Sequence, residues 1–175
     1  MNDTSASGLG NIVAVSKRVS QRRTCLYVEE SQADLLLVER LIARRIDLIL
    51  LTADSGPLGL KMAQDHQPDI ILLDINLPDA SGLEVLAILR SSPSTARIPV
   101  TALSSNAFPS QIAEGLKNGF FRYLTKPFRI AEFMTAIDDM LLHARQPVTL
   151  HEPSDVRKPH QGPAAGTIAN RAQSP

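Results

Sequence analysis

The stretch DIILLDINLPDASG spans residues 69–82. Its four consecutive apolar residues, 70–73, are followed directly by Asp74. An apolar run followed by proline and glycine is typical of a strand that is buried on both faces of a sheet. A carboxylate at the carboxyl end of such a strand lies where open α/β sheets bind their ligands. Asp74 is therefore the first candidate for a functional residue.

Similar apolar runs alternate with amphipathic segments on both sides of this stretch. We expect strands at 24–28, 48–52, 70–73, 100–103 and 121–125, and helices at 32–44, 58–66, 83–90, 109–118 and 130–145. Five strands that alternate with five helices predict a doubly wound α/β fold, with a parallel sheet covered on both faces. In the strand order 2-1-3-4-5, the crevice falls between the first and third strands.

Composition divides the 175 residues into three parts. Residues 1–22 form a Ser/Gly-rich and then basic leader, and residues 146–175 form a tail rich in Pro, Gly and Ala. Both ends are expected to be disordered, which leaves 23–145 as the folded domain. The 18 basic and 18 acidic residues cancel, and the basic ends leave a mildly acidic middle. This pattern argues against direct binding of nucleic acid.

The single cysteine, Cys25, lies in an expected strand and is interpreted as a small buried residue. A low cysteine count suits a reducing cytoplasm. No apolar stretch reaches the roughly 20 residues that a membrane span needs.

Polar residues follow four of the expected strands. Glu29 and Glu30 come after the first strand, Asp74 after the third, Ser104 after the fourth and Lys126 after the fifth. The carboxyl ends of parallel strands lie along one edge of the sheet, so these side chains should surround a single point. Each residue alone is uninformative because loops are generally polar, but the complete set in one α/β pattern is a strong signal.

Three carboxylates a few Å apart repel one another unless a cation or a proton intervenes. Mg²⁺ is the natural candidate, because it takes oxygen ligands, uses few protein carboxylates and keeps several waters. Asp74 could then attack phosphorus and become an aspartyl phosphate. Lys126 and the Ser104 hydroxyl would each donate to a phosphoryl oxygen, where negative charge develops.

Residues 24–145 resemble the receiver domain of bacterial two-component response regulators, and most closely the receivers of hybrid sensor histidine kinases. The resemblance rests on YVEE at 27–30, ILLDINLP at 71–78, GLE at 82–84, IPV at 98–100, SSNA at 104–107, and the segment from Gly119 to YLTKPF at 123–128. It covers about seven tenths of the chain and implies a flavodoxin-like fold.

The resemblance also implies a function. Asp74 would accept a phosphoryl group from a sensor histidine kinase or a histidine phosphotransfer protein, and the protein would catalyse only its own phosphorylation and dephosphorylation. Glu29, Glu30, Asp74 and the backbone carbonyl of Asn76 would hold Mg²⁺, and Lys126-Pro127 would be a cis bond. Ser104 and Tyr123 would form the switch, biased by a new charge of about −2.

Signalling would then proceed through protein contacts with a downstream target, because no DNA-binding output domain follows. A homodimer could form through residues 109–118, 121–125 and 130–145, the usual partner surface of the family. The expected location is the cytoplasm.

One departure from the family pattern leaves an alternative open. Glu30 stands where the family usually has Asp, and Mg²⁺ tolerates little geometric error. The alternative is a degenerate receiver that binds a partner without phosphate. A flavodoxin-like or haloacid-dehalogenase-like enzyme is disfavoured, because no Gly-rich phosphate loop follows the first strand. Asn76 also stands where the dehalogenase-type phosphatases usually have a second Asp.

Overall fold

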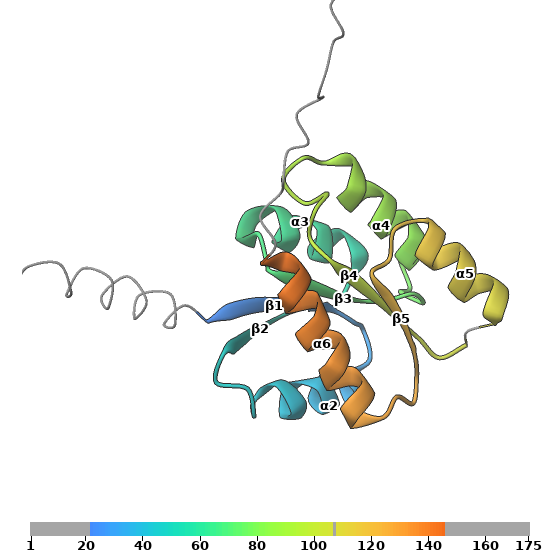
Figure 1. Cartoon of the computed structure of the whole chain (residues 1–175). Coiled ribbons are helices and arrows are strands. Elements are labelled where there is room, and N and C mark those ends of the chain that lie inside the picture. The colour runs from blue at the N-terminus through green and yellow to red at the C-terminus, as the bar shows by residue number, and fades with distance from the viewer. Residues whose placement is uncertain (1–21, 107, 146–175) are drawn as a thin grey trace, which may run out of the picture.

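A parallel sheet of five strands forms the centre of the molecule (Figure 1). The computed structural model describes residues 22–106 and 108–145, so the predictions for 1–21 and 146–175 lie outside the described residues. The strand order is β2-β1-β3-β4-β5, which confirms the predicted fold. The strands are β1 (Arg23–Val28), β2 (Leu48–Ala53), β3 (Ile70–Asp74), β4 (Val100–Ser104) and β5 (Arg122–Thr125).

Within residues 22–106 and 108–145, five helices cover the two faces of this sheet. Helices α2 and α6 pack on one face, and α3, α4 and α5 lie on the other (Figure 1). Their bounds are α2 (Gln32–Ile42), α3 (Gly56–His66), α4 (Gly82–Ser91), α5 (Pro109–Lys117) and α6 (Ile130–Ala144).

The central strand β3 shows why its sequence is apolar without interruption. All five of its residues are buried. Ile70 and Leu72 belong to the core cluster under α2 and α6, whereas Ile71 and Leu73 belong to the cluster under α3 and α4. Successive side chains of a strand point to opposite faces, so a strand with helices on both sides needs apolar residues at every position.

Several element boundaries differ from the sequence-based expectation by one or two residues. Helix α2 ends at Ile42 rather than at residue 44, because the turn that follows leads directly into β2. Helix α3 begins at Gly56, so that Pro57 lies in its first turn, where the missing N–H costs no helical hydrogen bond. Strands β3 and β4 extend one residue further than expected, to Asp74 and Ser104.

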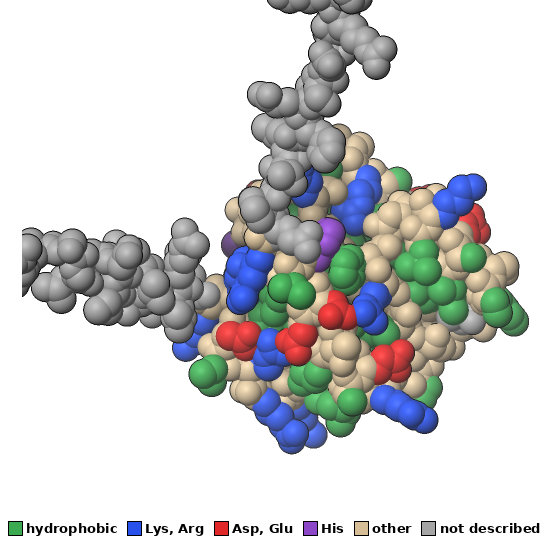
Figure 2. Space-filling model, in the orientation of Figure 1, with side chains coloured by type: hydrophobic (Ala, Val, Ile, Leu, Met, Phe, Trp, Pro, Cys, Tyr) green, Lys and Arg blue, Asp and Glu red, His purple; other side chains and the backbone are tan. Residues whose placement is uncertain are grey.

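Charged side chains of both signs alternate over the face shown in Figure 2. Arg45 pairs with Asp47 and Asp138, and Arg122 pairs with Asp139. This face of the described residues therefore presents no continuous basic area. Among residues 22–106 and 108–145, no helix combines the length and apolarity that crossing a bilayer requires.

Candidate functional site

The register of the sheet brings the polar residues at the strand ends together. Asp74, the last residue of β3, lies opposite Leu103 of β4, and Ser104, the last of β4, lies opposite Thr125 of β5. Glu29 and Lys126 directly follow the ends of β1 and β5. These side chains therefore meet at one edge of the sheet, as the topology of a parallel sheet requires.

Lys126 is the centre of this group. Its Nζ donates to Glu29 Oε2 at 2.5 Å, to Asp74 Oδ2 at 2.7 Å and to Asp34 Oδ2 at 2.8 Å. The side chains of Glu29 and Asp74 are only 3% and 9% exposed, whereas that of Asp34 is 37% exposed. One ammonium thus links three carboxylates from three different elements, two of them buried.

The group contains one ammonium and three carboxylates, and these charges determine its electrostatics. Burial alone would lower the pKa of Lys126, but its hydrogen bonds to Asp34, Asp74 and Glu29 outweigh burial and raise the pKa above its ordinary value. Lys126 is therefore charged at any physiological pH. With the three carboxylates ionised, a single ammonium leaves the group with two uncompensated negative charges, which attract a further cation.

Asp34 was missed by the sequence reasoning. It lies in the first turn of α2, where Ser31 caps the helix and its Oγ accepts from the Asp34 N–H at 3.4 Å. Ser31-x-x-Asp34 is a helix-start pattern, and it could have indicated that Asp34 lies near the end of β1. Whether its side chain points into the crevice depends on the turn between β1 and α2, which the pattern does not specify.

Glu30 lies outside this group. Its side chain is exposed, while that of the preceding Glu29 is buried among the strand ends. Both residues follow the end of β1, but only Glu29 belongs to the three acids whose carboxylate oxygens lie within 4.8 Å of one another. The role predicted for Glu30 as a metal ligand stays a prediction.

The remaining predicted residues surround Asp74 and Lys126. The Asn76 N–H donates to Asp74 Oδ1 at 2.7 Å, and the Lys126–Pro127 peptide bond is cis. Ser104 is buried, and its hydroxyl donates to the Asn106 carbonyl at 2.8 Å. These contacts hold the Asp74 carboxylate from one side and direct the Ser104 hydroxyl into its own loop.

Tyr123, the predicted switch residue, is half-buried in β5. Its ring lies edge-on to Phe120 at 6.2 Å between centroids and close to Gly115 of α5. It therefore packs between the sheet and α5.

The donor set fits a hard divalent cation. Glu29, Asp34 and Asp74 each offer a carboxylate oxygen, and these oxygens lie within 4.8 Å of one another. All three ligands are oxygens, as Mg²⁺ and Mn²⁺ prefer, and the partial exposure of Asp34 leaves access for water ligands.

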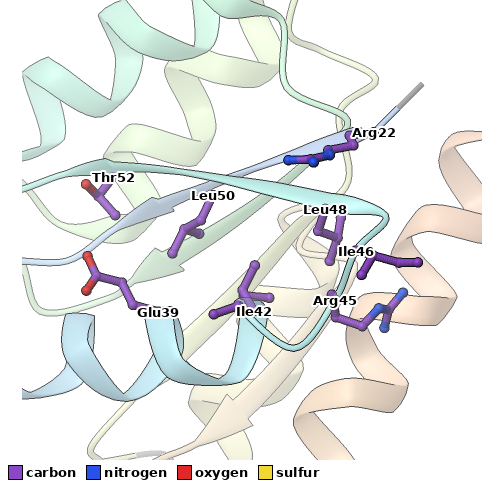
Figure 3. Close-up of a pocket in the computed structure, with 9 residues that line it drawn as sticks. Arg22, Glu39, Ile42, Arg45, Ile46, Leu48, Leu50 and Thr52 are labelled. Carbon is purple, nitrogen blue, oxygen red and sulfur yellow. The ribbon is translucent and has the colours of Figure 1, made fainter. Parts of the chain in front are cut away.

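A separate recess of about 460 Å³ lies between α2 and β2 (Figure 3). Ile42, Leu48 and Leu50 give it an apolar floor, and Glu39 and Arg45 lie at its margin. None of its lining residues belongs to the carboxylate group. The recess is therefore separate from the group of acids at the strand ends.

Comparison with known proteins gives a consistent picture. Residues 25–138 match the family model described as the response regulator receiver domain. The chain is 31% identical over 119 residues to the polar-differentiation response regulator DivK of Brucella ovis, covering 68% of this chain and 96% of DivK. It is also 31% identical over 121 residues to Histidine kinase P4 of Formosa agariphila, covering 69% of this chain but only 9% of that protein. The chain spans almost the whole length of DivK, but less than half the length of the other curated relatives that it matches, such as Histidine kinase P4 and the response regulator PleD of Caulobacter vibrioides.

A solved structure is similar over the same region. The receiver domain of the sensor histidine kinase PA1611 from Pseudomonas aeruginosa is 25% identical, with a TM-score of 0.62, and the match covers 69% of this chain and 98% of that one. That structure carries a magnesium ion coordinated in its active-site cleft.

Proposed function

Because this chain belongs to the family of response regulator receiver domains, we propose that it is a phosphoacceptor in a two-component phosphorelay. The observation that carries the proposal is the contact of Lys126 with Asp74, Glu29 and Asp34 at the carboxyl edge of the sheet. In this proposal Asp74 is the acceptor carboxylate, Lys126 is the cation for the transferred group, and Glu29 and Asp34 are two further acids beside them.

The reaction that we propose is phosphoryl transfer from a phosphohistidine. An Asp74 carboxylate oxygen forms the new bond to phosphorus while the phosphorus–nitrogen bond breaks, and the bonding electron pair returns to the imidazole of the partner. Lys126 then pairs with a phosphoryl oxygen, where negative charge accumulates. The partner is a sensor histidine kinase or a histidine phosphotransfer protein, and the setting that we propose is the cytoplasm.

Mg²⁺ is the proposed cofactor, and it would neutralise negative charge on the transferring phosphoryl group. Glu29 and Asp74 are the proposed ligands from the strand ends, with the backbone carbonyl of Asn76. We assign the place of the third acid to Asp34, because its carboxylate lies within the group and that of Glu30 does not. This assignment favours retained cation binding despite the unusual Glu30.

We propose that phosphorylation changes the surface formed by α5, β5 and α6, and that this change carries the signal. Phosphorylation adds a charge of about −2 beside Ser104, whose hydroxyl would exchange the Asn106 carbonyl for a phosphoryl oxygen. Tyr123 would move inward in response. The surface of α5, β5 and α6 would then contact a downstream protein or a second copy of the chain. Phe108 and Leu116 are exposed apolar side chains there, 59% and 45% exposed respectively.

The alternative, a phosphate-independent interaction module, also has an observation in its favour. The Lys126 ammonium contacts all three carboxylates and offsets part of their charge, which a receiver that never takes phosphate would also need. Breaking a buried ion pair is costly, and this contact could persist in a receiver that never takes phosphate.

The experiment that separates the two is treatment of the protein with acetyl phosphate or beryllofluoride in millimolar Mg²⁺, with Asp74→Asn as the control. Mass spectrometry should show one added phosphoryl group on the wild type and none on the variant. A wild type that stays unmodified, and whose two-dimensional NMR spectrum does not respond to beryllofluoride, would exclude the phosphoacceptor role and leave the interaction module.

A further inference from the structure

Tyr27 is a fully buried tyrosine directly beneath the carboxylate group. It lies in β1 and is 0% exposed, within the core cluster that α2 and α6 cover. Residues i and i+2 of a strand share a face, so Tyr27 and Glu29 point to the same side of β1. The Tyr27 hydroxyl accordingly donates to Glu29 Oε2 at 2.8 Å.

The Glu29 carboxylate is held by three donors. Oε2 accepts from the Tyr27 hydroxyl and from Lys126 Nζ, and Oε1 accepts from the Ser31 N–H at 2.9 Å. Lys126 divides its protons among three acids, whereas the Tyr27 hydroxyl has Glu29 as its acceptor. Tyr27 and Ser31 therefore fix the position of this carboxylate even when Lys126 turns to another partner.

Glutamate needs such support more than aspartate does, because it has one more rotatable bond to order. Mg²⁺ demands near-ideal geometry, so a ligand with an unrestrained carboxylate binds it poorly. Groups that hydrogen-bond to metal ligands commonly change the affinity for the metal by about 10- to 100-fold. The Tyr27 hydroxyl occupies this supporting place relative to Glu29.

We propose that Tyr27 is a positioning residue for cation binding. Its hydroxyl holds the Glu29 carboxylate in the orientation in which it coordinates the ion. This inference rests on the proposed function, because it requires the site to take Mg²⁺. Tyr27 itself acts only through Glu29 and touches neither the ion nor the phosphoryl group.

The test is calorimetric titration of Mg²⁺ into the full chain and into Tyr27→Phe, which removes only the hydroxyl. The affinity of the variant should fall by about tenfold. Thr101→Val is the matched control, because Thr101 is also 0% exposed and its hydroxyl also makes one buried hydrogen bond, to Met140 Sδ at 3.1 Å. The Thr101→Val variant should bind Mg²⁺ with the same affinity as the wild type.

A second pair of variants tests the route of the effect. In the Glu29→Gln background, Tyr27→Phe should change the Mg²⁺ affinity by less than twofold, because the carboxylate that it positions has gone. A tenfold loss that persists without the Glu29 carboxylate would overturn the role of Tyr27 as a positioning residue.

The outcomes are distinguishable. Equal affinities of wild type and Tyr27→Phe, or equal losses in Tyr27→Phe and Thr101→Val, overturn the inference and leave the proposed function intact. A wild type that binds no Mg²⁺ overturns both.

If Tyr27→Phe does not fold, Tyr123→Phe provides the measurement. The chain has two tyrosines and no tryptophan, so Tyr27 is then the only chromophore of its kind. Its near-ultraviolet absorption should shift as Mg²⁺ saturates the site, and an unchanged spectrum at saturation would also overturn the inference.

Discussion

Asp34 and Glu30 are both acids near the end of β1, yet only Asp34 contacts the Lys126 ammonium. The difference is one of direction, because Asp34 projects from the first turn of α2 toward the crevice while Glu30 faces solvent. At this scale, the identity of the third acid bears directly on the proposed binding of a cation. Three carboxylates share one point only when Asp34 is counted.

Neutralising each acid in turn separates their roles. Asp34→Asn should weaken Mg²⁺ binding by about tenfold or more, since a direct ligand should matter at least as much as its hydrogen-bond partners. Glu30→Gln should leave the affinity within about twofold, because an exposed charge at longer range is screened by water and salt. Titration calorimetry at fixed ionic strength measures both. The reverse ranking would return the ligand role to Glu30 and remove it from Asp34.

Helix α3 approaches β1 unusually closely at Gly59. A Cβ at this position would lie 2.7 and 2.9 Å from the two γ-methyl groups of Val28, which is too close for either to remain in place. Val28 is the residue before Glu29 and is 1% exposed. The contact between these two elements therefore fixes the strand end from which the acidic group is built.

Gly59→Ala tests this contact. Alanine in place of glycine would normally stabilise a helix by about 1 kcal/mol, but overpacking a core costs about 1–3 kcal/mol. We expect overpacking to prevail, because the atoms that must move are the γ-methyl groups of a buried strand residue. The free energy of unfolding measured in urea should therefore fall. The double variant Gly59→Ala with Val28→Ala should cost less than the sum of the two single variants. A Gly59→Ala protein more stable than wild type would mean that helix and strand separate freely.

At the scale of the whole molecule, the sequence predicted the architecture and the meeting of Glu29, Asp74 and Lys126 at one edge of the sheet. Apolar runs such as 70–73 are long enough to identify buried strands, and parallel topology then forces Asp74, Ser104 and Lys126 to one edge. The contact of Asp34 with Lys126 was not predicted, because it depends on how the chain turns between β1 and α2. The hydrogen bond from Tyr27 to Glu29 was not predicted either: the spacing of two residues places both side chains on one face, but it does not specify which acceptor the hydroxyl takes.

The single cysteine allows the stability of the whole fold to be measured without disturbing it. Cys25 is 0% exposed in β1, and burial raises the pKa of its thiol from 9.0 to about 12. At pH 9 an ordinary thiol is half ionised, whereas one with a pKa of about 12 is ionised in about one molecule in a thousand. Because the folded pKa is the higher one, the stability that Cys25 contributes is complete below pH 9 and declines as the pH rises toward 12.

We therefore expect iodoacetamide at pH 8 to label Cys25 only in molecules that have opened. Mass spectrometry should show one label at most, since the chain has one cysteine, and labelling should be at least about a thousandfold slower than in urea. Mg²⁺ at 100 times its dissociation constant should slow labelling through global opening about a further hundredfold, because it binds the folded state alone. Asp74→Asn should lose most of this Mg²⁺ effect. Rapid labelling of the native wild type would show that β1 opens locally, and that the core and the carboxylate site do not unfold as one unit.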